Sequence, residues 1–83
     1  MTITSTAIET YPTLRGATFT CDKVSVSVCV HTDGRWTVCV ENSSHAAYRG
    51  MGKRFASYDD AVEGYKNAKV KAILSAARDA LAV

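Results

Sequence analysis

Residues 24–41 read VSVSVCVHTDGRWTVCVE, and this stretch decides the fold. Valines alternate with short polar or thiol residues from Val24 to Val30, and the alternation resumes from Trp36 to Val40. A period of two is typical of a strand with one face in a core, and β-branched valines favour the strand conformation. Because Thr32-Asp33-Gly34 separates the two runs, the stretch predicts a β-hairpin.

The length of the hairpin loop decides which side chains share a face. A two-residue Asp33-Gly34 loop would put the two apolar rows on opposite faces of the sheet. A three-residue loop, with Gly34 in the left-handed conformation, puts both rows on one face. We therefore predict a second face of short polar and thiol side chains, and the pairs Val30–Trp36, Val28–Val38 and Val26–Val40.

A long helix is predicted to follow the sheet. Ser57 is a good N-cap, acidic residues follow it at 59–60, and strong helix formers come next. The side expected to cover the valine face carries Tyr58, Val62, Tyr65, Ile73, Ala76 and Ala80. A helix from Tyr58 to Leu81 would be ~36 Å long, against ~25 Å for a strand of about eight residues, so we expect it to overhang the sheet or to bend.

With 83 residues the chain has room for one core. We predict a single α+β domain over residues 17–83, with a three-stranded or four-stranded antiparallel sheet packed against one long C-terminal helix. The third strand is expected over about residues 46–55, loosened by its glycines. Residues 1–16 have no sustained apolar period and are predicted to form an N-terminal arm or an edge strand.

Composition and charge narrow the function classes. The net charge of +2 lacks the strong excess that is typical of nucleic-acid binders. The first residues lack the basic start and apolar run of a secretory signal, and no stretch approaches the ~20 apolar residues that span a bilayer. Three cysteines inside strand-like segments are interpreted as reduced thiols that fill space. We expect a cytoplasmic protein without membrane contact.

No motif commits the chain to a reaction. Cys29, His31 and Cys39 fall on the predicted second face, and with His45 they have the residue types of a zinc site, but not the Cys-x-x-Cys spacing of one. The acidic pair at 59–60 suits the helix dipole better than acid–base chemistry. We predict no catalytic residue, no metal and no cofactor, and hence a protein that is not an enzyme.

The most suggestive polar cluster is basic and spans residues 48–54. Its cations could contact phosphates or an acidic protein surface, or they could be the charges that protect an edge strand from aggregation. Lys69 falls on the apolar side of the helix, where it either packs its aliphatic chain near the sheet margin and keeps its ammonium group in water, or contacts a partner. The predicted partner-binding residues are Arg35, Tyr48, Arg49, Lys53, Arg54 and Lys69.

The last turns of the helix are apolar around a wide arc. If the helix overhangs the sheet, these apolar turns would be exposed to water in a monomer, and their small alanines would allow the helices of two copies to approach closely. We predict a homodimer, with closure over the N-terminal arm as the alternative. The predicted dimer seam consists of Ile73, Leu74, Ala77 and Leu81.

Residues spread over positions 34–68 follow the pattern of a known family. They are Gly34-Arg35-Trp36, Lys53-Arg54-Phe55, Ser57, Asp59-Asp60-Ala61, Tyr65 and Ala68. On these residues the stretch resembles the Apetala/ethylene-response-factor DNA-binding domain. The resemblance implies three strands followed by a helix, and DNA reading by arginines of the first two strands, where this chain has only Arg35.

In size, cysteine use and lack of catalytic motifs, the chain also resembles small phage-encoded inhibitors, anti-CRISPR proteins among them. That resemblance implies a compact α+β domain that blocks a bacterial nucleoprotein machine by occupying a surface. We therefore expect a phage or mobile-element inhibitor that docks on a bacterial protein or nucleoprotein complex. The alternative is a nucleic-acid-binding domain that uses the basic strand edge.

Overall fold

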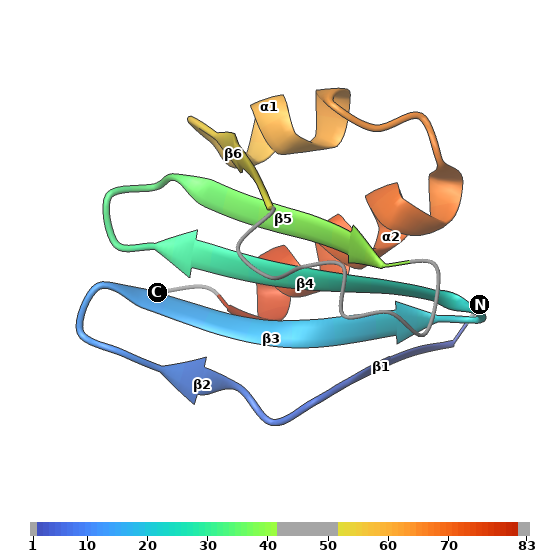
Figure 1. Ribbon diagram of the computed structural model, residues 1–83, viewed down its shortest axis with the longest axis horizontal. Coiled ribbons are helices and arrows are strands. Elements are labelled where there is room, and N and C mark those ends of the chain that lie inside the picture. The colour runs from blue at the N-terminus through green and yellow to red at the C-terminus, as the bar shows by residue number, and fades with distance from the viewer. Residues whose placement is uncertain (1, 42–51, 82–83) are drawn as a thin grey trace.

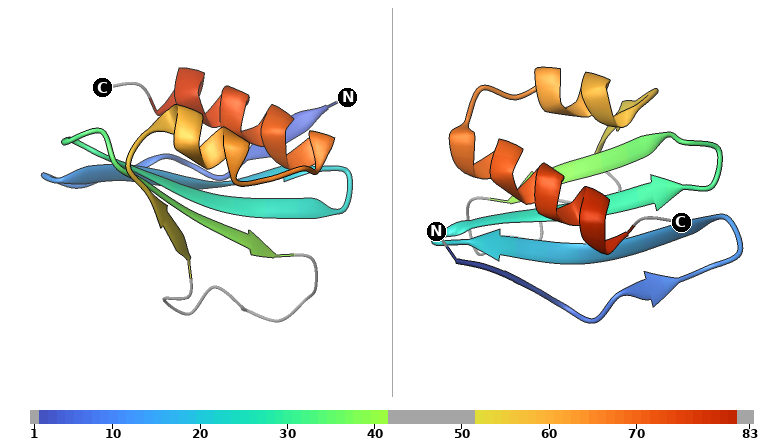
Figure 2. Two further views of the ribbon diagram at one scale, coloured as in Figure 1. Left: turned by 90° about the horizontal axis from the view of Figure 1, so that it is seen from above. Right: turned by 180° about the vertical axis from the view of Figure 1, so that it is seen from behind.

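The computed structural model describes residues 2–41 and 52–81, which form an antiparallel sheet with two helices on one of its faces (Figures 1 and 2). The α+β class is confirmed. The strands are β1 (Ile3–Ser5), β2 (Glu9–Thr10), β3 (Leu14–Cys21), β4 (Val24–His31), β5 (Trp36–Glu41) and β6 (Lys53–Phe55). The helices are α1 (Tyr58–Glu63) and α2 (Ala68–Ala80).

The sheet has more strands than the three or four predicted. Over the described residues it is six-stranded, in the order β1-β3-β4-β5-β6, and β2 pairs with β3 as well. Residues 3–10 supply β1 and β2, both on the free edge of β3. Their side chains are mostly exposed, so backbone pairing forms these strands without an apolar period that the sequence could reveal. Of the predicted third strand, residues 53–55 form β6, and residues 46–51 lie outside the described residues.

The hairpin register is confirmed. Val30 pairs with Trp36, Val28 with Val38 and Val26 with Val40. The turn is closed by the His31 N–H, which donates to the Arg35 carbonyl at 2.8 Å, and Gly34 has a φ of 93°. The valine rows therefore share one face, and β3 extends that face with Phe19 opposite Val26.

The core lies between this valine face and the two helices. Helix α2 covers β3 and β4, while α1 packs against β5 and β6 (Figure 2). The rings of Trp36 and Tyr58 join α1 to the sheet at 5.1 Å between centroids. The buried apolar residues are Phe19, Cys21, Val26, Val28, Trp36, Val38, Ala61, Val70, Ile73, Leu74, Ala77 and Leu81.

The single helix predicted over 58–81 is broken into two. Ser57 caps α1 as predicted, accepting the Asp60 N–H at 3.2 Å, but α1 ends at Gly64. A β-carbon at Gly64 would lie 2.7 Å from the ring of Phe55, so this glycine allows a close approach to β6. Asn67 then caps α2, because its side chain accepts the backbone N–H groups of residues 69 and 70. The helical segment therefore changes direction sharply between Gly64 and Asn67, which corresponds to the predicted bend and not to the predicted overhang.

The break also changes which side of the helical segment is buried. On α2 the buried residues are Val70, Ile73, Leu74 and Ala77, whereas Ala80 is exposed. The predicted apolar side was counted along one continuous helix from Tyr58. Because α2 is a separate helix with its own start, the residues that face the core in α2 differ from those predicted. Tyr58, Val62 and Tyr65 remain half-buried against the core as expected.

The predicted dimer seam is corrected for the same reason. Its four residues have a relative exposure of 0% within one chain, because α2 lies along the sheet instead of overhanging it. They belong to the core and offer no surface to a second copy. The residues concerned are Ile73, Leu74, Ala77 and Leu81.

Replacing the turn glycine should destabilise the hairpin through the backbone alone. Nothing lies within 4 Å of the position that a β-carbon would take at Gly34, but its φ of +93° disfavours side chains. We expect Gly34→Ala to lower the free energy of unfolding by about 1 kcal/mol, measured by urea denaturation. Gly34→Asn should lose less, because asparagine tolerates positive φ. An alanine variant as stable as the wild type would contradict the assigned turn.

A charge in the buried side of α2 should unfold the chain. Leu74→Glu places an unpaired carboxylate in the core. This should lower the free energy of unfolding by several kcal/mol, which is comparable with the whole stability of a small domain. We expect circular dichroism to show loss of structure. The control Ala68→Glu, at the exposed first residue of α2, should stay within about 0.5 kcal/mol of wild type. A folded Leu74→Glu chain of half the wild-type mass in light scattering would instead restore the dimer seam.

Candidate functional site

The face of the sheet away from the helices, called the open face below, carries short side chains. Hydroxyl groups pair across neighbouring strands: Thr18 and Ser27 are 2.9 Å apart, and Thr20 and Ser25 are 3.1 Å apart. In each pair one hydroxyl donates to the other, so the face is polar without long flexible charges. The central open-face residues are Thr18, Thr20, Ser25, Ser27, Cys29, His31, Thr37 and Cys39.

One row of this face runs straight across the sheet from edge to edge. Its members lie directly opposite one another on successive strands β2 to β6, in the order Glu9, Gly16, Cys29, Thr37 and Arg54. The two charged side chains are at the ends, and the middle positions have small side chains or none. The row is therefore low at its centre and bounded by opposite charges.

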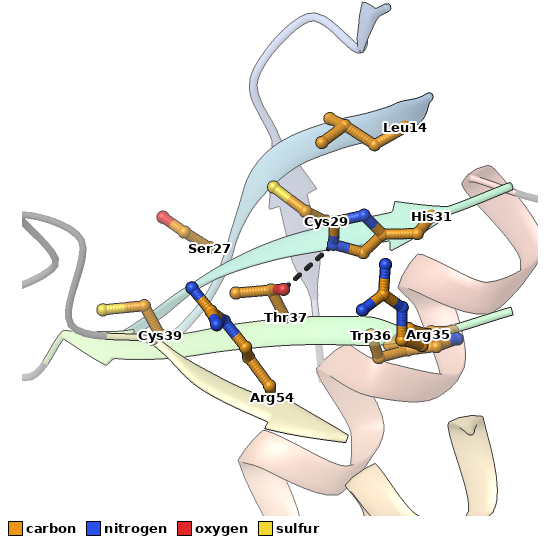
Figure 3. A pocket seen from close by; sticks show the side chains of 10 residues that line it. Leu14, Ser27, Cys29, His31, Arg35, Trp36, Thr37, Cys39 and Arg54 are labelled. Atoms are coloured by element: carbon orange, nitrogen blue, oxygen red, sulfur yellow. Dashed lines mark hydrogen bonds between the residues drawn. The ribbon is translucent and has the colours of Figure 1, made fainter. Parts of the chain in front are cut away.

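A pocket of about 600 Å³ opens on this face toward the arginine end of the row. Figure 3 shows its side chains, which come from β3, β4, β5, β6 and the hairpin turn. Two arginines line the pocket, and no described lining residue is acidic, so it has positive character. The lining residues are Leu14, Ser27, Cys29, His31, Arg35, Trp36, Thr37, Cys39, Gly52 and Arg54.

The two arginines have different surroundings. The Nε of Arg35 is 2.8 Å from Oδ2 of Asp33, and the backbone N–H of Arg35 donates to Oδ1 at 3.1 Å. That backbone hydrogen bond, followed by the charge of Arg35, lowers the pKa of Asp33. Arg54, in contrast, forms no ion pair with any residue of the described ranges, and its side chain points back over β5 (Figure 3).

A histidine and a threonine supply a hydrogen-bonding pair at the pocket. Nε2 of His31 is 3.0 Å from Oγ1 of Thr37 (Figure 3). If Nε2 carries the proton and donates it to Thr37, the threonine hydroxyl keeps its own proton for another acceptor. If Thr37 donates to Nε2, the proton of a neutral imidazole is on Nδ1. Either tautomer leaves the pair with one further donor.

The Cys29 thiol at the pocket favours its neutral form. Burial raises the pKa of the half-buried Cys29, and the charge of Glu9 at the far end of the row raises it further. Cys29 lies diagonally to Cys39, since Cys29 pairs with Thr37 and Ser27 with Cys39. Within residues 2–41 and 52–81 there is no group of three or more potential metal ligands, and His45 lies outside these ranges.

The structure brings together only part of the predicted partner-binding set. Arg35 and Arg54 line one pocket, whereas Lys53 projects to the helix side, with its Nζ 5.8 Å from the centroid of the Tyr65 ring. Successive residues of a strand point to opposite faces, so the sheet divides the basic cluster. Tyr48 and Arg49 lie outside the described residues.

Lys69 is also remote from the pocket. It lies in the first turn of α2 on the helix side, and its Nζ is 3.1 Å from Oδ2 of Asp22 in the turn between β3 and β4. The side chain is part-exposed, as expected for a snorkelling lysine at the sheet margin, and it ties α2 to that turn. This contact is a local structural role for Lys69.

Sequence reasoning missed the neutral residues of the pocket. The sequence predicts His31 on the second face but no joint role with Thr37, and it places Leu14 in the segment expected as an N-terminal arm or an edge strand. The sequence does indicate that His31 and Thr37 lie close together, because the three-residue turn puts both on one face of adjacent strands. Leu14 could not be found this way, because its place depends on the pairing of β3 with β4.

Comparisons with protein-family models, with curated proteins and with solved structures found no match to this chain. In the part of the chain that the structure describes, neither helix has the length and apolar character to cross a bilayer. The open face of the sheet therefore carries the candidate functional site.

The raised pKa of Cys29 should be visible in its alkylation. Because iodoacetamide reacts with the thiolate, a higher pKa means less reactive species at a given pH. We expect Cys29 to react more slowly at neutral pH in the folded protein than in urea, and its rate to rise only at higher pH. Peptide mass spectrometry after timed quenching measures each thiol separately. Glu9→Gln should accelerate Cys29 modestly, and equal rates in folded and unfolded protein would contradict the assignment.

Proposed function

We propose that this chain is a small non-enzymatic binding protein that docks, through the open face, on a larger protein or nucleoprotein complex in the bacterial cytoplasm. The observation that carries the proposal is the pocket on the open face, which has two arginines and no acidic side chain among its described lining residues. The opposite face of the sheet is used by the core, so recognition and folding use different sides of the same strands.

The open face suits burial against a partner. Serine, threonine and cysteine lose little conformational entropy when a surface is covered, compared with lysine or glutamate. The Thr18–Ser27 and Thr20–Ser25 pairs already satisfy hydroxyl groups internally, so covering them leaves fewer groups without a hydrogen bond. Docking here loses less free energy to ordering and desolvation than docking on a face of long charged side chains.

Inhibition is the consequence of docking that we propose. The resemblance in type to small phage-encoded inhibitors, anti-CRISPR proteins among them, supports this choice. A protein of 83 residues that covers part of a larger machine acts by steric exclusion, and for that it needs affinity and shape but no chemical step. A pocket with fixed positive charge then selects the partner surface.

Nucleic-acid binding is the second candidate, favoured by the two arginines that share one pocket. Its weakness is the number of phosphates that the described residues can neutralise. Lys53 points to the helix side, and Asp33 already pairs with Arg35. Because affinity for duplexes grows with the number of phosphates contacted, this arrangement favours a protein partner.

Site-specific cross-linking tests which face binds. A photoreactive benzoylphenylalanine at Ser25 lies on the open face beside the pocket, and the same residue at the exposed Lys71 lies on α2. In a bacterial lysate we expect a discrete cross-linked product from the Ser25 variant and none from the Lys71 variant. Excess wild-type protein should abolish the product, whereas Arg54→Glu protein should compete at least about tenfold less well, the loss expected for a charged contact.

Three results would contradict the proposal: equal labelling from both positions, equal competition by Arg54→Glu, or a product that is nucleic acid. Affinity for random duplex DNA and RNA, measured against salt concentration, is the matching control. A steep salt dependence would favour the second candidate, and no binding at low salt would remove it.

A further inference from the structure

We propose that the open-face pocket is a carboxylate site, which receives an aspartate or glutamate side chain of the partner protein between Arg54 and Arg35. This inference rests on the proposed function and adds the chemistry of the partner. It depends on four features of the pocket: its charge, its neutral donors, its apolar walls and the small number of its cations.

The charge of the pocket is uncompensated on the side of Arg54. This side chain has no ion-pair partner in the described ranges, yet it points across β5 into the pocket and not away from the sheet (Figure 3). The contact of Arg35 with Asp33 uses Nε, and the guanidinium group of Arg35 points toward His31 (Figure 3). Arg54 and Arg35 thus line the pocket from β6 and from the hairpin turn, and an anion between them would offset the charge of Arg54, which Asp33 does not neutralise.

Neutral donors lie beside this charge. The His31–Thr37 pair keeps one further donor in either tautomer, and it is placed on the two central strands of the pocket. A carboxylate has two oxygens and about four acceptor sites, so it can accept from a guanidinium fork and from this pair together. A neutral amide of the same shape would have its own N–H groups facing these donors.

The remaining walls select an anion on a hydrocarbon stem. Leu14 lines the pocket, and Cys29 is held as a neutral thiol by burial. Such walls can cover the methylene groups of a glutamate or aspartate while the arginines hold the charge. A nucleic-acid backbone would instead present a series of phosphates, and Arg54 and Arg35 are the only permanent cations among the described residues that line the pocket.

Nuclear magnetic resonance can test the site with a defined probe. The probe is tetraglutamate with an acetylated N-terminus and an amidated C-terminus, titrated into ¹⁵N-labelled wild-type protein; tetraglutamine of the same length is the control. We expect tetraglutamate to shift the amides of Cys29, His31, Thr37 and Arg54, and tetraglutamine to leave them unchanged.

Matched variants show whether the arginine fork is responsible. Arg54→Gln should weaken tetraglutamate binding about tenfold, which corresponds to about 1.4 kcal/mol. Arg54→Lys should recover only part of the affinity, since an ammonium group is a point charge without a fork. Lys71→Gln removes a cation from exposed α2 and should leave the affinity unchanged.

Three outcomes overturn the carboxylate site. They are no localised shift, a loss with Lys71→Gln as large as with Arg54→Gln, and saturation of the same amides by inorganic phosphate at a lower concentration than by tetraglutamate. The cross-linking experiment separates this failure from failure of the proposed function. A Ser25 product that competes through Arg54, combined with no tetraglutamate binding, leaves open-face docking in place and removes the carboxylate.

Discussion

The fold depends on one local constraint, the length of the turn between β4 and β5. Side chains of a strand alternate between faces, so a shift of one residue in pairing would move every valine of one strand to the other side. The three-residue turn with Gly34 at a φ of 93° prevents that shift. It thereby gives both helices an apolar surface to cover, and it leaves the serines, threonines and two of the thiols on the opposite side.

The same alternation positions the candidate site. His31 and Thr37 meet because they lie on one face of adjacent strands, and Arg54 joins them because β6 continues the sheet in register. Lys53, the neighbour of Arg54 in sequence, is directed to the helices by the same rule. Charge density along the sequence therefore overstates the positive charge that a partner meets on either face.

The sequence predicted what short-range physics determines. The hairpin register follows from two periodic runs and a glycine, and the α1 cap follows from Ser57. For residues 1–16 an arm or an edge strand was predicted, and the edge strand is confirmed by β1 and β2, whose bounds the sequence could not give because exposed edge strands are formed by backbone pairing and need no apolar pattern. The helix break was missed because it depends on the close approach of Gly64 to the ring of Phe55. Only the tertiary structure determines how these two segments lie relative to each other. Of the pocket, Arg35 and Arg54 were named in advance and His31 was placed on the right face, while the place of Leu14 required the pairing of β3 with β4.

The separation of the two sheet faces has an evolutionary consequence. Open-face positions such as Ser27, Thr37 and Arg54 lie on the far side of the backbone from Val28 and Val38. If the open face is the docking surface that we propose, substitutions there alter recognition while the hydrophobic interior keeps its packing. A lineage of such chains could then follow a changing target through successive generations without first acquiring extra thermodynamic stability, because adaptation and folding would draw on different residues.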